Sequence, residues 1–414
     1  MILLILSGEA IFVLPFVLIR VFRTVYLDVF NLNHTELGIC YSIYGVVALV
    51  AYLFGGSFAD RIQPRYLIAF SLVITAFGGF YLSSIPSFIG LQISYGFWGF
   101  STVFFFWSAM IKATRLWGGK SDQGKAFGFL EAGRGLAAAS FGLLGVFIIS
   151  SLLGELDLNQ TQIKVNALRT IILVTSLLVA LIGAAVFFFL KFENSNEFTS
   201  HNPVKKDYLL VLKETKVWLM MLIVLAGYIG YKITDIIPQF SRDILGFSDI
   251  ASAKIGTSFL YLRMLVALIF GFLAQRINAI KLISISFVFV CIASIVFSTY
   301  DVQLELLIYF FGPLIFLGLG IYAVRTLYFS LFELTGTPLT ITGAMIGVIS
   351  VVGFTPEIFM GPIIGYYLDQ YPGIEGYHYL FSFLAIVSLI GTISTVVLYK
   401  LNINSVDLPI KNKN

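Results

Sequence analysis

The sequence GSFADRIQPRYL, residues 56–67, returns in altered form as GFLAQRINAIKL at residues 271–282. Each copy lies between two long apolar runs. The offset that relates Gly56 to Gly271 also relates Gly128 to Gly343, and each of the latter glycines lies near the start of another apolar run. Two correspondences at one offset indicate an internal duplication, which is typical of membrane transporters.

The composition identifies the surroundings of this chain as lipid. Hydrophobic residues make up 58% of the 414 residues and charged residues 12%, against about 25% charged residues in soluble proteins. Mean hydropathy is +0.94. A helix that crosses a bilayer needs about 20 mostly apolar residues. We therefore predict an all-α membrane protein with twelve transmembrane helices in two pseudo-symmetric six-helix bundles. The predicted spans are residues 3–30, 36–58, 66–85, 89–114, 126–151, 168–190, 216–240, 252–275, 279–299, 303–330, 341–366 and 378–400.

The longest polar stretch divides the chain in the middle. We predict an N-terminal bundle at residues 1–191, a cytoplasmic linker at 192–214, a C-terminal bundle at 215–402 and a cytoplasmic tail at 403–414. Lys and Arg concentrate in the loops on the side of both termini, and the positive-inside rule places that side in the cytoplasm. We expect a monomer in a bacterial inner (cytoplasmic) membrane.

The sequence offers little for catalysis or for large charged partners. It has no nucleophile beside a base, no His and Cys spacing for a metal, and no glycine loop that would cradle phosphates. The net charge of +4 follows from the positive-inside bias, so no nucleic acid is implied. We expect no enzyme and no cofactor. The expected partners are a small-molecule substrate, the lipid bilayer and a coupling ion, either a proton or inorganic phosphate.

The repeated motif resembles one in the major facilitator superfamily, and the resemblance extends over essentially the whole chain. Gly56, Asp60, Arg61 and Arg65 match the pattern between the second and third helices of that family, from which Gln63 and Pro64 depart. In the family, the Asp caps the N-terminus of a neighbouring helix, pairs with an Arg and holds the outward-open arrangement. The resemblance implies the same gating role here, whereas a tight positive-inside turn would be the structural alternative.

The second copy of the motif lacks the acid. Gly271, Gln275 and Arg276 occupy the matching positions, so that the expected latch in the second half is weaker and uncharged. Two further segments, AFGFLEAGRGLAAASFG from Ala126 and TGAMIGVISVVGFTPEIFMGPIIGYYLD from Thr342, are similar to the sugar-phosphate permease side of the superfamily, which includes organophosphate:phosphate antiporters. In that group, basic residues of the first and seventh helices hold the substrate phosphate.

Charged side chains inside the apolar runs are the main site candidates. A charge at the bilayer centre costs at least about 2.5 to 3.5 kcal/mol, so it needs a partner, a wet cavity or a function. An Arg fork binds carboxylate or phosphate through two hydrogen bonds. The substrate-binding candidates are Arg20, Arg23, Lys232, Arg263, Tyr228 and Tyr231. With the resemblance, they predict a secondary carrier that moves a small anionic solute, an organophosphate or carboxylate, by alternating access.

Internal neutralisation is the alternative for each of these charges. The candidate pairs are Lys232 with Asp235, Arg134 with Glu131, and Arg325 with Glu333, while Arg263 would need an acid on another helix. One of Arg20 and Arg23 could instead reach the outer surface or pair with Asp28. We rank Arg20 above Arg23 as a binding candidate because it lies deeper in the membrane. The offset between the two repeats places Arg20 at the position equivalent to Asp235.

A proton-coupled symporter of a neutral or zwitterionic metabolite is the competing hypothesis. Asp235 and Glu357 are its proton-coupling candidates, because a carboxyl group in a low dielectric can titrate near neutral pH. Glu357 follows Pro356, which frees a backbone carbonyl, so a hydrogen bond to a neighbouring helix would explain the dipeptide equally well. A non-transporting membrane sensor is a third possibility.

Overall fold

The computed structural model describes residues 1–59, 62–118, 123–153, 161–191, 212–301, 307–328, 331 and 349–406. These residues contain no strand and include twelve helical spans long and apolar enough to cross a membrane, so the predicted fold class is confirmed. Each span overlaps the predicted run of the same order. The spans are Ile2–Phe30, His34–Tyr52, Pro64–Leu82, Phe88–Trp117, Gly128–Leu152, Gln162–Phe189, Thr215–Asp243, Asp249–Leu273, Ala279–Thr299, Ile308–Leu327, Ile349–Gln370 and Ile374–Asn402.

Several spans are built from more than one helical element. The N-terminal half contains α1 (Ile2–Phe12), the π-helical turn η1 (Val13–Val17), α2 (Leu18–Phe30), α3 (His34–Ala59), α4 (Pro64–Leu82), α5 (Phe88–Phe100), the π-helical turn η2 (Ser101–Trp107), α6 (Ser108–Gly118), α7 (Gln123–Leu153) and α8 (Thr161–Phe189). The C-terminal half contains α10 (Thr215–Ile233), the 3-10 turn η3 (Thr234–Ile236), α11 (Ile237–Asp243), α12 (Asp249–Leu273), α13 (Ala279–Thr299), α14 (Ile308–Leu327), α17 (Pro356–Gln370) and α18 (Ile374–Val406).

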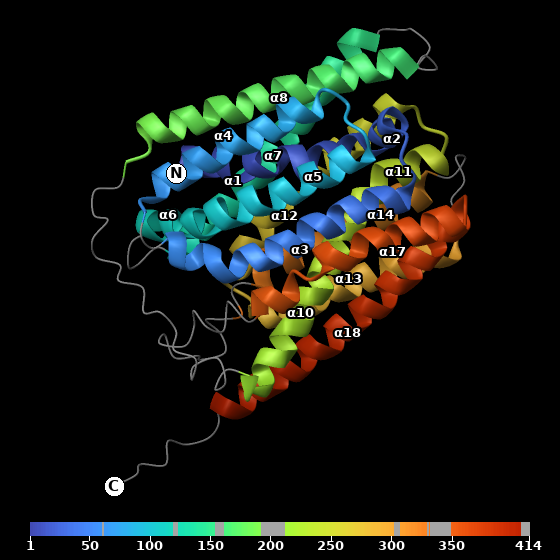
Figure 1. The fold of residues 1–414 in the computed structure, drawn as a ribbon. Helices are drawn as coiled ribbons and strands as arrows, with labels where there is room; N and C mark the ends of the chain where they lie inside the picture. The colour runs from blue at the N-terminus through green and yellow to red at the C-terminus, as the bar shows by residue number, and fades with distance from the viewer. Residues whose placement is uncertain are drawn as a thin grey trace.

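The internal duplication is visible in the helix boundaries. Helix α3 begins at His34 and α12 at Asp249, and α4 begins at Pro64 and α13 at Ala279, so both pairs of starts are related by the offset of the repeated motif. Buried apolar side chains form two clusters. One extends from Leu4 to Leu190 with two additions from α12, and the other extends from Val217 to Leu398. The two halves lie above and below one another in Figure 1.

Some of the predicted segments lie outside the described residues. They are Asp60 and Arg61 of the motif, Glu333, Gly343, the linker except its last three residues, and the tail from residue 407. The domain boundaries at 191 and 215 therefore stay a prediction.

The most extensive contacts between helices of the two halves are α3 with α17 and α7 with α12, and α2 also packs against α12, α11 and η3. Figure 1 shows α3 and α17 side by side. Glycines allow the close approach of the first pair: a Cβ on Gly361 would lie 2.7 Å from the carbonyl oxygen of Gly38. Real Cβ atoms do not come so near, and small residues are the usual means of close helix packing in membranes.

The first helix of each half is irregular where polar residues occur. The first span includes a π-helical turn around Pro15, and Phe22 leaves helical geometry with φ −114° and ψ 32°. The seventh span tightens to a 3-10 turn at Thr234–Ile236, just before Pro238. Proline removes a hydrogen-bond donor and disturbs the preceding turn. Asp235 lies in this 3-10 turn, and Arg20 lies in α2 between the π-helical turn and Phe22.

Candidate functional site

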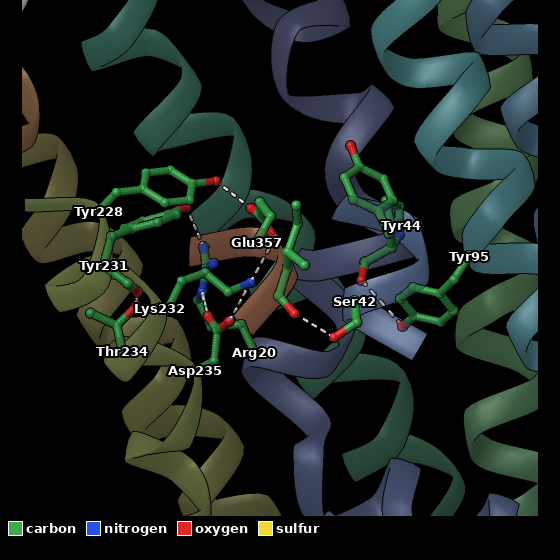
Figure 2. A network of polar contacts seen from close by, with 12 residues as sticks. Arg20, Ser42, Tyr44, Tyr95, Tyr228, Tyr231, Lys232, Thr234, Asp235 and Glu357 are labelled. Atoms are coloured by element: carbon green, nitrogen blue, oxygen red, sulfur yellow. Dashed lines mark hydrogen bonds and ion pairs between the residues drawn. The ribbon is translucent and has the colours of Figure 1, made fainter. Parts of the chain in front are cut away.

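Five buried residues and the partly buried Glu357 form one network, which we call the central cluster: Arg20, Tyr228, Tyr231, Lys232, Asp235 and Glu357 (Figure 2). Arg20 Nε lies 2.5 Å from Asp235 Oδ1, and Arg20 Nη1 donates to the Tyr231 hydroxyl at 2.5 Å. Arg20 and Asp235 are the equivalent positions of the two halves, so the contact joins α2 to η3 across the pseudo-symmetry.

Lys232 connects the two carboxylates of the central cluster. Its Nζ lies 3.3 Å from Asp235 Oδ2 and 3.1 Å from Glu357 Oε2. The Tyr228 hydroxyl donates to the other oxygen of Glu357. Lys232 is 1% exposed, and its ammonium also lies 4.4 Å from the centre of the Tyr41 ring. The residues that the sequence predicted as site candidates on the seventh span are thus brought together with Arg20 and Glu357.

A second group, the Glu9 cluster, consists of Glu9, Glu131, Arg134 and Arg263. Arg134 lies 3.1 Å from Glu9 and 2.6 Å from Glu131, and Arg263 lies 3.2 Å from Glu9 and 3.6 Å from Glu131. Arg263 belongs to α12 of the C-terminal half, while the other three residues belong to α1 and α7. Glu9 therefore supplies the partner from another helix that Arg263 needs. The sequence analysis missed Glu9, although it is an acid in the first apolar run.

The charges of the two clusters balance. Arg20, Arg134, Lys232 and Arg263 all lie within 4 Å of a carboxylate of Glu9, Glu131, Asp235 or Glu357. Each group thus has two positive and two negative members. Removing one partner from a buried pair leaves an uncompensated charge, which is strongly destabilising.

Arg325 differs from these cations. Its Nε and Nη1 atoms are buried without a hydrogen-bond partner, and the described residues place no carboxylate within ion-pair distance of it. Its guanidinium carbon lies 3.7 Å from the centre of the Tyr231 ring, and the guanidinium carbon of Arg20 lies 4.4 Å from the same centre. Glu333, the partner considered for Arg325, lies outside the described residues.

Arg23 does not lie where one alternative placed it. It is 2% exposed, so it does not reach the surface, and its Nε has no hydrogen-bond partner. Asp28 instead contacts Lys164 at 2.6 Å and Arg242 at 3.2 Å. The expectation that Arg20 or Arg23 pairs with Asp28 is therefore wrong, because cations from α8 and α11 already hold that carboxylate.

A cavity between the two halves lies beside both clusters. It has about 980 Å³ of atom-free space, part of it open to solvent. Its charged lining residues are Glu9, Arg20, Glu131, Arg134, Arg325 and Glu357. Aromatic side chains provide much of the remaining wall, among them Phe12, Tyr44, Tyr52, Trp107, Tyr228, Tyr231, Tyr328 and Phe354. Of the predicted binding residues, Arg23, Lys232 and Arg263 are not in this wall.

The predicted gating residues lie at the ends of helices. Gly56 is in the last turn of α3, and Arg65 is in the first turn of α4, where it donates to the Tyr66 hydroxyl at 2.5 Å. In the second copy, Gly271 is in the last turn of α12, and Gln275 and Arg276 are exposed in the turn that follows. A gating role for these residues stays a prediction.

Comparison with known proteins decides the family. The family model described as Major Facilitator Superfamily matches residues 5–356. The chain belongs to the Major Facilitator Superfamily. Among curated relatives, the inner membrane protein YihN of Escherichia coli K12 is 27% identical, covering 96% of this chain and 94% of its own length. The inner membrane protein YqcE of the same organism is 26% identical, covering 83% of this chain and 81% of its own length.

Solved structures of other Major Facilitator Superfamily members share the fold. A bacterial homolog of the human lysosomal transporter Spinster, in an inward-facing and unoccupied conformation, has a TM-score of 0.72 at 14% identity and covers 97% of both chains. The nucleoside transporter NupG has a TM-score of 0.71 at 14% identity, covering 96% of this chain and 99% of its own. The protein is thus an integral membrane transporter of this superfamily and not an enzyme, as the sequence predicted.

Proposed function

We propose that this transporter carries a small organic anion by alternating access, and that Arg325 is the residue that binds the anion. The observation that carries the proposal is the state of Arg325. It lines the cavity, two of its nitrogen atoms are buried without an acceptor, and no carboxylate of the described residues lies within ion-pair distance of it. A buried guanidinium remains charged and needs an acceptor, which an incoming carboxylate or phosphate would supply.

The charge of the cavity wall supports one anionic group on the substrate. The charges within the two clusters cancel, because they contain four cations and four carboxylates. Arg325 therefore adds one uncompensated positive charge next to the cavity. Tyr231 lies between Arg20 and Arg325 and keeps both guanidinium groups over its ring. The aromatic wall would contact the organic part of the solute. A carboxylate or an organophosphate fits this description.

The closed end of the cavity supports alternating access. The cavity lining extends from Arg20 and Glu357 toward Glu9 and Tyr52, near the end of the molecule where the chain begins. At the opposite end, α3 and α17 are in direct backbone contact. We place the chain start in the cytoplasm from the distribution of Lys and Arg, so we infer that this conformation faces inward.

A thermal-shift panel on the purified transporter tests the proposed substrate class. The panel contains monocarboxylates, sugar phosphates, amino acids and nucleosides. We expect stabilisation by organic anions, since a ligand present at 100 times its Kd adds about 2.7 kcal/mol. A compound that stabilises the protein is then used in counterflow with proteoliposomes. Stabilisation by neutral compounds alone would contradict the proposal.

Two contacts of Glu357 favour the second candidate function, proton-coupled symport of a neutral or zwitterionic metabolite. Glu357 lines the cavity and holds both Lys232 and the Tyr228 hydroxyl. Protonation of this carboxyl would release Lys232 and alter the wall. Such a coupling of proton binding to a local rearrangement is what a symporter requires.

Glu357→Gln distinguishes this candidate from the first. If Glu357 carries the coupling proton, the variant loses uptake driven by a proton gradient but retains exchange of internal for external substrate. Uptake and exchange are measured in the same proteoliposomes with the compound found in the panel. Glu214→Gln, at the exposed start of α10, is the matched control. Gradient-driven uptake by the Glu357 variant at the wild-type rate would exclude the coupling role.

A further inference from the structure

The carboxylate of Asp369, from the C-terminal half, binds the start of α3 in the N-terminal half. Its Oδ1 accepts from the backbone N–H of His34 at 3.0 Å. Its Oδ2 accepts from the backbone N–H of Thr35 at 2.7 Å and from the Thr35 hydroxyl at 2.6 Å. The first N–H groups of a helix lack partners within the helix, and a carboxylate there is further favoured by the helix dipole.

The position of Asp369 in its own helix is unfavourable for a negative charge. Asp369 lies in the last turn of α17, where a negative charge is unfavourable because the carbonyl end of a helix is already negative. The partner helix α3 compensates this cost. The contact therefore stabilises a particular placement of α17 against α3, in addition to satisfying the start of α3.

Backbone packing beside Asp369 shows that the contact belongs to a closed state. A Cβ on Gly365 would lie 2.6 Å from the carbonyl oxygen of His34, and one on Gly361 would lie 2.7 Å from that of Gly38. The two helices thus touch without intervening side chains at these points. Any opening of this end of the cavity has to separate them and break the three hydrogen bonds of Asp369.

We propose that Asp369 is the latch that holds this end of the transporter closed. The proposal rests on the alternating access proposed above and adds the residue that sets its resting state. At the opposite end of the same helix pair, the family resemblance assigns the corresponding task to Asp60.

Other polar contacts at the same end are weaker candidates for this role. Asp28, Lys164, Arg242 and Asp249 connect the halves through ion pairs of 2.6 to 3.4 Å. The side chains of Asp28 and Arg242 are 35% and 31% exposed, and exposed ion pairs contribute little. Lys164 and Asp249 are less exposed, at 13% and 5%, but a single contact of 3.0 Å joins them across the halves. Asp369 combines charge with three hydrogen bonds at a helix start. Its loss should therefore change the equilibrium between the closed and open states of this end the most.

The test measures the distance between the two halves at this end of the transporter, without any substrate. Cysteines are placed at Ser87, at the start of α5, and at Thr299, at the end of α13, in a Cys40→Ser/Cys291→Ser background. Spin labels on them give the distance distribution in proteoliposomes. Asp369→Asn should raise the ratio of the long to the short distance about ten-fold. Thr35→Val, which removes one hydrogen bond, should give a smaller change in the same direction.

Two further variants make the result decisive. Glu375→Gln alters a carboxylate at the same end that accepts from the Tyr379 hydroxyl at 3.3 Å, and it should leave the distance distribution unchanged. Gly365→Ala should lengthen the distance by steric conflict with α3. If Gly365→Ala lengthens it and Asp369→Asn does not, packing alone closes this end and the latch is rejected. That outcome leaves the anion assignment of Arg325 unaffected, since no solute enters the measurement.

Discussion

Arg325→Gln is expected to reduce stabilisation by organic anions strongly while leaving the protein without ligand as stable as the wild type, or more stable. The first effect follows because hydrogen bonds to a charged group contribute about 1.5 to 3 kcal/mol, which corresponds to a rise in Kd of roughly ten- to a hundred-fold. The second effect follows because no carboxylate of the described residues lies within ion-pair distance of Arg325, so the substitution removes a charge without a direct partner.

The measurement is the thermal shift of the variant with and without the anion found in the panel. Arg325→Lys keeps the charge but loses the planar fork, so we expect intermediate binding. Arg276→Gln, in the exposed turn after α12, is the control for loss of one positive charge. An unchanged ligand response in Arg325→Gln, or a fall in melting temperature without ligand, would refute the assignment of Arg325 as the anion-binding residue.

Arg20→Gln should have the opposite effect on stability. Its removal leaves Asp235 with only Lys232, which also holds Glu357, so one negative charge of the central cluster is no longer compensated. Loss of one partner of a buried pair costs about 3 to 5 kcal/mol. The double variant Arg20→Gln/Asp235→Asn removes both charges and restores the balance between Lys232 and Glu357. It should be more stable than Arg20→Gln alone.

Unfolding of the four proteins of this cycle in a detergent titration gives their coupling free energy. We expect a coupling of about 2 to 3 kcal/mol between positions 20 and 235, which are in direct contact. Additive losses in the double variant would show that the two side chains do not depend on one another, and the central cluster would then lose its role as a structural anchor of the cavity.

The fold could be predicted from the sequence because lipid imposes strong constraints. Each span must satisfy its backbone within a helix and present apolar side chains, and both requirements are visible in local sequence. The offset between the two copies of the motif predicted the correspondence of Arg20 with Asp235, and the matching starts of α3 and α12 agree with it. The sequence could thus give the spans and the approximate depth of each charge.

The pairing of charges could not be predicted in the same way. Depth in the membrane says little about the direction in which a side chain points, and that direction depends on the rotation of each helix against helices from the other half. Glu9 reaches Arg263, which is 254 residues away, and Asp369 reaches Thr35 across 334 residues. The alternative that paired Arg23 with Asp28 was wrong for this reason, because Lys164 and Arg242 come from distant helices to occupy Asp28.

The contact of Arg20 with Asp235 has a consequence for how such a protein can arise. In a twofold dimer of one half, equivalent positions on the axis face their own copies, so an arginine there would meet an arginine and an aspartate would meet an aspartate. Two like charges in a dry interior repel one another. Opposite charges at that point become possible only after fusion into a single polypeptide, whose two copies can mutate independently.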